Sequence, residues 1–398
     1  MKAAVLSALF VNFYQARRTL MRKFCLGPTI YMGASSLEEV LSGTKKAFIV
    51  TDKFMHESGK VSYVSCFFNK IGVEYEIFSD VSPDPDMETV AEGIKRLTAF
   101  GADTIVAFGG GSAIDAAKSI SHISGGIINN RAVFVVIPTT SGTGSEVSRY
   151  AVITDRERNM KYPLADDSLL PDFAVLDAAL VESVPPPVTA DTGVDALTHA
   201  IEAFLSTGAN DFSDAMAEKA MKLIFKNLLT AYSEPHNIEA RQAVHNAATM
   251  AGVAFSNAGL GANHSLAHAA GAKLHLPHGR ANAILLPYVM SFTAGCHTSL
   301  TPAAARYAQM AAVLNLDSNG VRQSALAAIR ATRNLIRKLN IPASFHEAGV
   351  DKKIFEGELD AMTEAAMADG CMATAPVPFR PDEIRSIFRT AYSGKLLV

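Results

Sequence analysis

Short apolar runs alternate with helical patterns over the first half of the chain. Runs with the length of buried strands cover residues 47–51, 75–78, 104–108, 133–137 and 173–176. Between the second and third runs, Met87, Val90, Ile94 and Leu97 repeat at helical spacing, as expected of a crossover helix that covers a parallel sheet. The pattern predicts an α/β domain with a parallel, Rossmann-like sheet over about residues 23–184.

Three consecutive prolines, at residues 185–187, mark the end of this pattern. Proline fixes the backbone and removes a hydrogen-bond donor, so such a run interrupts regular structure. Beyond it, strand-like runs give way to long helical patterns rich in alanine and leucine. We therefore expect a second, all-α domain over residues 185–398.

Composition narrows the class of protein. The chain has 398 residues, a formal net charge of −3, 19% charged residues and 49% hydrophobic residues, which argues against a nucleic-acid-binding surface and favours small-molecule partners. No apolar run reaches the roughly 18 residues of a membrane span, and residues 1–23 do not follow the pattern of a signal peptide. The four cysteines are scattered and form no CxxC pair, so we expect neither a disulfide framework nor a thiolate zinc site, and a reducing, cytoplasmic location.

Aspartate and histidine residues in the second half form two clusters with helical spacing. Asp195 and His199 are four positions apart, as are His264 and His268, and His278 follows. Side chains at i and i+4 share one face of a helix and can bind one ion. One such pair alone is more often a surface contact, but three imidazoles and a carboxylate together suit Fe(II) or Zn(II). Spacing leaves four histidines for three places, so His268 is either a ligand or a proton-handling group beside the metal.

A glycine loop follows the apolar run at residues 104–108. Gly109, Gly110, Gly111 and Ser112 separate this run from a helical pattern. Glycines let the backbone approach a phosphate, and the free N–H groups of the helix end point at it. The sequence lacks the GxGxxG fingerprint, however, and three glycines can also form a simple tight turn.

A second loop, at residues 138–146, follows the next apolar run and is rich in hydroxyl groups. Open α/β sheets bind nucleotides at the carboxyl ends of neighbouring strands, so the two loops together favour a nucleotide site. The residues that we expect to bind the cofactor there are Gly109, Gly110, Gly111, Ser112, Asp115, Thr139, Thr140, Thr143 and Ser145.

Two further residues bear on the cofactor. Asp52 follows the apolar run at residues 47–51, where a carboxylate can accept from ribose hydroxyls and repel a 2′-phosphate, which favours NAD over NADP. The alternative is a solvated loop carboxylate. Lys161 is a candidate donor to the cofactor, or else one more surface lysine.

The blocks at residues 109–118, 138–146, 192–203 and 277–282, in this order, resemble the iron-containing (group III) alcohol dehydrogenase family. The likeness runs from about Leu26 to the end of the chain. It implies an N-terminal NAD-binding α/β domain and a C-terminal α-helical domain that binds the metal. By this resemblance the metal ligands are Asp195, His199, His264 and His278, and His268 lies near the nicotinamide and the substrate.

Within the family, the sequence is most similar to the alcohol dehydrogenases of ethanolamine and propanediol utilisation. Residues 176–180 and 272–278 carry this finer likeness. Ala178, Val194 and Arg280 differ from the residues that are commoner in the family at those positions. None of the three is an expected ligand, so they bear on substrate preference more than on chemistry.

The resemblance implies an NAD(H)-dependent enzyme that interconverts short-chain primary alcohols, such as ethanol and 1-propanol, and their aldehydes. Fe(II), or alternatively Zn(II), would act on the substrate oxygen as a Lewis acid; the catalytic residues would be Asp195, His264 and His268, the last as a proton relay. Phe255 either lines the pocket or belongs to the core. Oxidation of glycerol or 1,2-diols and a dehydroquinate-synthase-like lyase reaction are the alternatives. The family also suggests a homodimer or a larger homo-oligomer.

Residues 1–22 form an amphipathic extension ahead of the expected sheet. Its apolar stripe and flanking basic residues are Leu6, Leu9, Phe10, Phe13, Arg17, Arg18, Leu20 and Arg22. We predict a targeting helix that binds a shell or enzyme partner of a bacterial microcompartment. The alternative is packing on its own or a neighbouring subunit, and the basic cluster is too short to favour a membrane surface.

Overall fold

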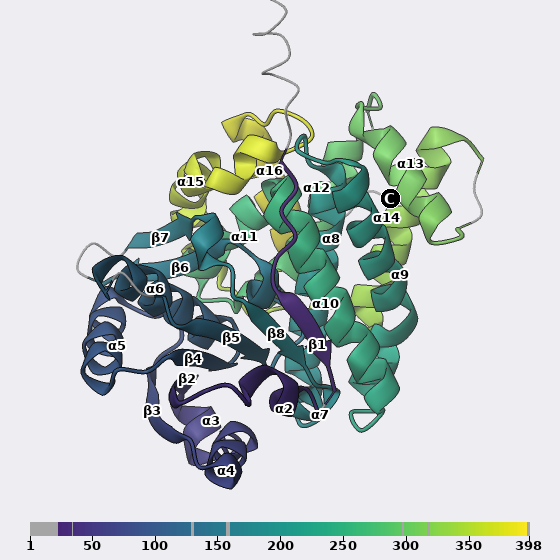
Figure 1. The fold of residues 1–398 in the computed structure, drawn as a ribbon. Helices are drawn as coiled ribbons and strands as arrows, with labels where there is room; N and C mark the ends of the chain where they lie inside the picture. Colours follow the sequence, from purple (N-terminus) through teal and green to yellow (C-terminus); the bar gives the residue numbers. More distant parts are fainter. Residues whose placement is uncertain are drawn as a thin grey trace, which may run out of the picture.

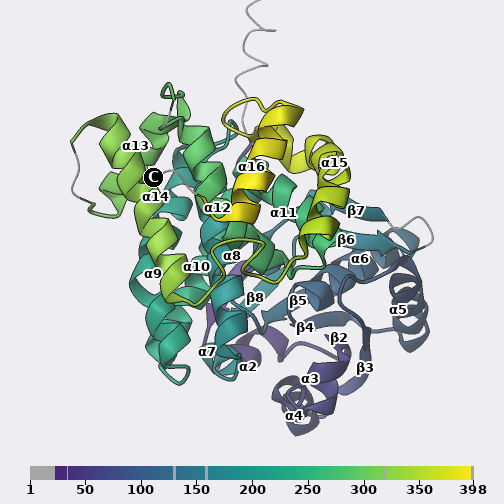
Figure 2. The ribbon, with the colours of Figure 1, turned by 180° about the vertical axis from the view of Figure 1, so that it is seen from behind.

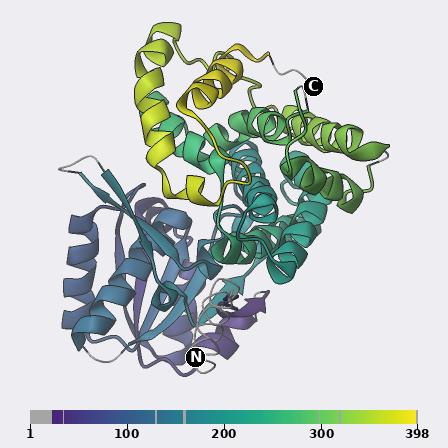
Figure 3. The same ribbon diagram turned by 90° about the horizontal axis from the view of Figure 1, so that it is seen from above.

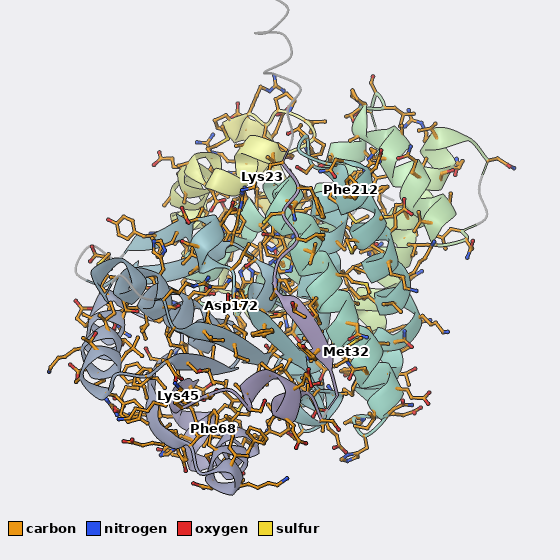
Figure 4. The ribbon with its side chains drawn as sticks, viewed as in Figure 1. Lys23, Met32, Lys45, Phe68, Asp172 and Phe212 are labelled. Carbon is orange, nitrogen blue, oxygen red and sulfur yellow. The ribbon has the colours of Figure 1, made fainter. Side chains whose placement is uncertain are left out.

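The computed structural model describes residues 23–33, 35–128, 131–156, 160–296, 298–316 and 319–395, without the side chains of residues 127, 128, 160 and 161. The predicted targeting helix at residues 1–22 lies outside the described residues. The described chain begins at Lys23, which is labelled with Phe212 in Figure 4. The ring of Phe24 packs on that of Phe212, at the start of the helix α9 (Asp211–Ser233), with centroids 5.4 Å apart.

Six parallel strands form the central sheet of the amino-terminal half. They are β1 (Thr29–Met32), β2 (Lys46–Asp52), β3 (Glu74–Val81), β4 (Thr104–Gly109), β5 (Val133–Pro138) and β8 (Phe173–Leu176). Their order across the sheet is β1-β8-β5-β4-β2-β3, and every neighbouring pair is parallel. All five strands that the sequence predicts are present, and the α/β class is confirmed.

Helices cover both faces of this sheet (Figure 1). The strand β2 shows how the alternation of side chains divides the core: Phe48 and Val50 pack with residues of α5 (Met87–Phe100) and α6 (Gly111–Ile128). Its other face packs against α2 (Ser36–Leu41), α3 (Lys53–Glu57) and α4 (Ser62–Ile71). Each face of the sheet is thus buried, as parallel strands require.

The sequence patterns do not predict a two-stranded antiparallel sheet that follows β5. It consists of β6 (Tyr150–Asp155) and β7 (Met160–Ala165), and the short helix η1 (Ser145–Val147) leads into it. Pro163 lies inside β7, where a proline disfavours a strand assignment from sequence. The sheet has two strands, so β7 is an edge strand, and an edge strand can accommodate a proline.

The carboxyl-terminal half contains helices and no strand among its described residues. Its elements are α7 (Ala178–Val181), α8 (Pro186–Leu205), α9, α10 (Ile238–Ala258), α11 (Ala262–Leu274), α12 (His278–Ala294), α13 (Ala303–Val313), α14 (Gly320–Lys338), α15 (Lys352–Ala368), η3 (Gly370–Thr374) and α16 (Pro381–Ser393). They bury one continuous hydrophobic cluster. Seen from behind and from above, the helices form a second lobe beside the sheet (Figures 2 and 3). None of the described helices is both long and apolar enough to cross a membrane.

A contact between two glycines joins the lobes. Gly144, in the loop after β5, has φ +62°, and a Cβ built on it would lie 2.5 Å from the Cα of Gly252 on α10. A Cβ on Gly252 would in turn lie 2.7 Å from Val147 Cγ2 and 2.9 Å from Gly144 O. The loop after β5 can lie this close to α10 only because both positions lack a side chain.

Replacing Gly252 by alanine tests this contact. The added methyl group would overlap the backbone of Gly144, and overpacking of this kind costs about 1–3 kcal/mol. We expect a matching loss in the free energy of unfolding, measured by urea denaturation. The control is Gly357→Ala on α15, where nothing lies within 4 Å of the added Cβ and where alanine should stabilise the helix by about 1 kcal/mol. Equal effects of the two substitutions would contradict the close contact.

Candidate active site

The predicted metal ligands converge where three helices meet. The ligand atoms of Asp195, His199, His264 and His278 all lie within 4.8 Å of one another. Helix α8 carries the first two residues one turn apart, α11 carries His264 in its first turn, and α12 begins at His278. The fold thus presents one carboxylate and three imidazoles to a common point.

The electrostatics of these four groups favour a cation. Burial alone would raise the pKa of Asp195, but the nearby imidazoles of His199, His278 and His264 bring the pKa of this carboxyl far below its usual range. Burial lowers the pKa of His264 well below its usual value, and it also lowers the pKa of His199. Near neutral pH the carboxylate is therefore ionised and these rings are neutral, which are the states that coordinate a metal.

Two ring nitrogens of the cluster, Nδ1 of His199 and Nε2 of His264, are buried without a hydrogen-bond partner among the described residues. The Nε2 atom of His264 lies 3.8 Å from Asp195 Oδ1. A buried polar atom is ordinarily paired, because leaving it unpaired costs free energy. A divalent cation bound by the carboxylate and the imidazoles would satisfy this nitrogen, so the residues present fit the metal that the sequence predicts.

Glu202 orients the ring of His264. Its Oε2 contacts His264 Nδ1 closely and also accepts from His264 N at 3.3 Å, while its Oε1 accepts from Asn263 N at 2.6 Å. Burial raises the pKa of Glu202 to about 8, against the lowering effect of the backbone N–H groups. A carboxyl group that is hydrogen-bonded to one ring nitrogen fixes the ring and directs the other nitrogen at the metal position.

Asn282 orients the carboxylate of Asp195. Its buried Nδ2 donates to Asp195 Oδ1 at 2.8 Å and lies 3.1 Å from His278 Nε2. Asn263 Nδ2 donates to Asn282 Oδ1 at 2.9 Å and so fixes the orientation of the Asn282 amide. The amide holds Asp195 in one rotamer at the edge of the cluster.

His268 lies beside the four-residue cluster and has a partner of its own. Its ring stacks on His278 with centroids 5.3 Å apart, and its Nδ1 lies 2.8 Å from Asp369 Oδ2. Asp369 Oδ1 accepts from Ser265 Oγ at 3.1 Å and from Cys371 N at 2.8 Å. Burial would raise the pKa of Asp369, but the interaction with His268 and the hydrogen bonds from Cys371 lower it to about 2. Asp369 is thus an ionised carboxylate that fixes the orientation of a half-exposed imidazole.

An aromatic stack forms one wall of the cluster. The ring of Phe255 stacks on His199 at 4.6 Å between centroids, and Tyr150 of β6 stacks on Phe255 at 6.4 Å. Phe255 is only 7% exposed and belongs to the main core. Both interpretations of Phe255 from the sequence therefore apply, since a core residue also borders the histidines.

The glycine loop and the hydroxyl-rich loop pack against each other. They follow the adjacent strands β4 and β5, and Thr139 N donates to Gly109 O at 2.9 Å. A Cβ on Gly111 would lie 2.9 Å from Thr143 Cγ2, and a Cβ on Gly110 would lie 3.5 Å from the side chain of Thr140. Ser112 lies in the first turn of α6. The two loops therefore form one surface at the carboxyl edge of the sheet, which is where a nucleotide is expected.

The hydroxyl-rich loop also contacts the helix that carries the first two metal-site residues. A Cβ on Gly142 would lie 2.7 Å from Thr192 Cβ and 3.0 Å from Thr192 O. Thr192 precedes Asp195 by less than one turn of α8. Hence the expected cofactor surface and the histidine cluster share a boundary.

The side chains of Asp115 and Ser145, two of the expected cofactor residues, bind each other. Asp115 Oδ1 accepts from Ser145 Oγ at 2.7 Å, and its Oδ2 accepts from Val152 N at 3.0 Å. Lys118, one turn later, is fully buried and donates to the carbonyls of Ser148 at 2.6 Å and Tyr150 at 2.8 Å. Because the Asp115 and Ser145 side chains bind each other, we infer that they hold the loop in place.

Asp52, at the end of β2, caps a helix and borders the glycine loop. Its Oδ1 accepts from Met55 N at 2.9 Å and caps α3. Its Oδ2 lies 3.4 Å from the position of a Cβ on Gly109, so the carboxylate borders the glycine loop. Lys161 pairs with Thr154 in the β6/β7 sheet, and its side chain is outside the described atoms.

Comparison with known proteins decides the family. Residues 28–178 match the family described as iron-containing alcohol dehydrogenase, and residues 189–392 match the Fe-containing alcohol dehydrogenase family, C-terminal. The chain belongs to the iron-containing alcohol dehydrogenase family. It is accordingly an NAD(P)-dependent oxidoreductase.

Several relatives match this dehydrogenase over nearly its whole length. It is 42% identical over 359 residues to the 1-propanol dehydrogenase PduQ of Citrobacter freundii, which covers 89% of this chain and 96% of that protein. It is 39% identical over 391 residues to an NADPH-dependent butanol dehydrogenase of Clostridium saccharobutylicum, with 94% and 99% coverage. The structure of a 1,3-propanediol oxidoreductase superposes with a TM-score of 0.86 at 32% identity and covers 94% of this chain and 100% of that one.

The sequence patterns did not predict the residues that orient the metal-site side chains in this dehydrogenase. Glu202 had a readable signal, because it lies seven positions after Asp195 and therefore on the same face of α8. Asn282 lies one turn after His278 on α12. Asp369, in contrast, precedes η3 and is 101 positions away from His268. No local pattern connects these two residues.

The buried Lys118 predicts a specific pH dependence of stability. Burial lowers its pKa from 10.5 to about 8 in the folded protein. Between these pH values the unfolded chain binds more protons than the folded one, so this residue makes stability rise with pH, by at most about 1.4 kcal/mol per pH unit. We expect the free energy of unfolding of the wild type to increase relative to that of Lys118→Met as the pH rises from 8 to 10.5. Urea denaturation at each pH measures both values.

The matched control is Lys95→Met on α5, because the Lys95 side chain is 78% exposed. The difference in free energy of unfolding between Lys95→Met and the wild type should stay constant with pH. A constant difference for Lys118→Met as well would show that Lys118 keeps an ordinary pKa.

Proposed function

We propose that the protein is a metal-dependent, NAD(H)-linked alcohol dehydrogenase and aldehyde reductase that acts on short-chain primary alcohols. The observation that carries the proposal is the convergence of Asp195, His199, His264 and His278, with a buried and unpartnered Nε2 on His264. The names of the relatives, a 1-propanol dehydrogenase and a butanol dehydrogenase, support this substrate class.

The four converging residues would hold the ion, Fe(II) by the family's name and Zn(II) as the alternative. When bound there, the ion would supply Lewis-acid stabilisation of negative charge on the substrate oxygen. Glu202 and Asn282 keep His264 and Asp195 in the rotamers that face this position. The protein therefore needs no rearrangement of these two side chains to present them.

His268 is placed to move the proton of the alcohol. Asp369 would accept from Nδ1, which leaves Nε2 to accept a proton during oxidation and to return it during reduction. The His268 side chain is 41% exposed, so the proton can pass on to water. Asp369 stabilises the imidazolium that forms in between.

The wall formed by Tyr150 and Phe255 favours simple alcohols over polyols. Phe255 stacks on His199, and Tyr150 stacks on Phe255. These rings would make this side of the cluster apolar, so an additional substrate hydroxyl placed there would lose its hydrogen bonds to water. This favours ethanol and 1-propanol over glycerol and 1,2-diols, which are the nearest alternative substrates.

The coenzyme would bind on the surface formed by the two loops, with its phosphates at Gly109, Gly110, Gly111 and Ser112 and with Thr139, Thr140 and Thr143 nearby. The carboxylate of Asp52, beside Gly109, favours NAD, since it would repel the 2′-phosphate of NADP. Lys161 remains a candidate donor to the coenzyme. A homo-oligomer, and microcompartment binding through residues 1–22, also remain predictions.

The activity test uses metal-stripped protein with NAD and one alcohol at a time, namely ethanol, 1-propanol, 1,2-propanediol or glycerol. Fe(II), Zn(II) or no metal is added without oxygen, and NADH absorbance is followed. We expect metal-dependent NADH formation that is fastest with the monoalcohols and falls at least about 100-fold in His264→Ala.

The control variant is His236→Ala, because the side chain of His236 is 86% exposed and pairs only with Glu182 among the described residues. It should keep full activity. NADH formation that needs no metal would contradict the metal assignment, and NAD binding without any NADH accumulation would favour a dehydroquinate-synthase-like lyase.

Coenzyme choice is tested with Asp52→Asn. Asparagine caps a helix about as well as aspartate does, so the substitution removes the charge and keeps the cap of α3. We expect kcat/KM for NADP to rise by about 10-fold relative to that for NAD, without a change in the unfolding free energy. An unchanged coenzyme ratio would show that Asp52 is only the cap.

A further inference from the structure

His278 differs from the other three metal-site residues in its surroundings. Its side chain is 44% exposed, whereas those of Asp195 and His264 are 4% and 1% exposed. It is the first residue of α12, and the preceding Pro277 supplies no side-chain cap. Core packing therefore holds His278 less firmly than the rest of the cluster, so an additional anchor for the first turn of α12 would help to keep it in place.

An ion pair supplies that anchor. Arg280, two residues after His278, donates from Nε to Asp191 Oδ1 at 2.6 Å and from Nη2 to Asp191 Oδ2 at 3.0 Å. The side chains are only 25% and 15% exposed. Two parallel hydrogen bonds between a guanidinium and a carboxylate fix both distance and orientation.

The pair joins the two helices at the level of the cluster. Asp191 lies on α8 one turn before Asp195 and on the same face, and α8 and α12 lie side by side (Figures 1 and 2). The backbones also touch here, because a Cβ on Gly279 would lie 2.5 Å from Asp191 O. His278 is thus flanked by a close backbone contact and a bidentate ion pair, both made to the same residue of α8.

The local electrostatics argue against a role in forming α12 itself. Arginine in the first turn of a helix faces the positive end of the helix dipole and weakens the helix. Asp191 offsets this charge, and Arg280 in turn neutralises a second carboxylate that would otherwise lie one turn from Asp195.

We propose that Asp191 and Arg280 are positioning residues that hold His278 in the metal cluster and thereby set how tightly the protein retains its ion. This inference rests on the proposed metal-dependent function. It adds two residues that are not among the four that converge on the ligand position.

The test measures metal binding directly. Metal-stripped wild type, Arg280→Ala, Arg280→Lys and Asp191→Asn are titrated with Co(II), and the visible absorption of the bound ion reports its ligands. Competition with a chelator gives Kd for Zn(II). We expect Arg280→Ala and Asp191→Asn to raise Kd by about 10–100-fold, as loss of groups that orient metal ligands typically does. Arg280→Lys keeps the charge but loses the two parallel hydrogen bonds of the guanidinium, so its Kd should lie between those of the wild type and Arg280→Ala. The Co(II) spectra of the variants should differ from that of the wild type.

Two controls separate positioning from general stability. Arg96→Ala removes an ion pair of similar exposure, with Glu76 on β3, away from the cluster; it should leave the Kd unchanged. Thermal unfolding of the metal-free proteins should show similar midpoints for wild type, Arg280→Lys and Asp191→Asn. His278→Ala gives the reference Kd for a site that has lost this ligand completely.

The outcomes distinguish the two levels of the proposal. Wild-type protein that binds neither Co(II) nor Zn(II) would overturn the proposed function and this inference with it. Tight binding in the wild type that is lost in His278→Ala but unchanged in Arg280→Ala and Asp191→Asn would overturn the positioning role alone. A rise in Kd that only follows a loss of metal-free stability, equally in Arg280→Lys and Arg280→Ala, would make the pair merely structural.

Discussion

The buried carboxylate of Asp195 is the constraint on which the rest of the catalytic region depends. A buried charge destabilises a fold unless partners surround it, and here the partners are three imidazoles and the Asn282 amide. These groups come from α8, α11 and α12, so the three helices must meet at one point. The packing of the helical lobe, with its many alanines between α8, α10 and α12, makes that meeting possible.

The side chains around the cluster have a consistent arrangement. His264 is held by Glu202, Asp195 by Asn282, and the adjacent His268 by Asp369. Each of these partners uses its other polar atoms on the backbone or on a further side chain, so its own position is fixed. Such preorganisation means that binding an ion or substrate requires little reordering of side chains. His278, on the exposed side, is the position where the structure is most open to change.

The two lobes meet through small residues. Gly142 touches Thr192 on α8, and Gly144 touches Gly252 on α10, so the hydroxyl-rich loop contacts both the sheet and the helices. On its other side Asp115 and Lys118 tie the segment after this loop to α6. One loop therefore couples the surface expected for the coenzyme to the helix that carries Asp195 and His199. Hydride transfer requires this closeness between coenzyme and substrate.

The sequence by itself determined five of the six strands of the parallel sheet, the helical character of the second half, the glycine loop and the five residues with ligand spacing. These features are local, because strand length, helical periodicity and i, i+4 spacing involve neighbouring residues. The choice among the four histidines needed the family resemblance, since spacing treats His264 and His268 alike. Tertiary structure alone decided the β6/β7 hairpin, the engagement of Asp115 with Ser145, and the pairs His268–Asp369 and Asp191–Arg280. Each of these joins segments that are distant in the sequence, and only the packing of whole helices and strands brings them together.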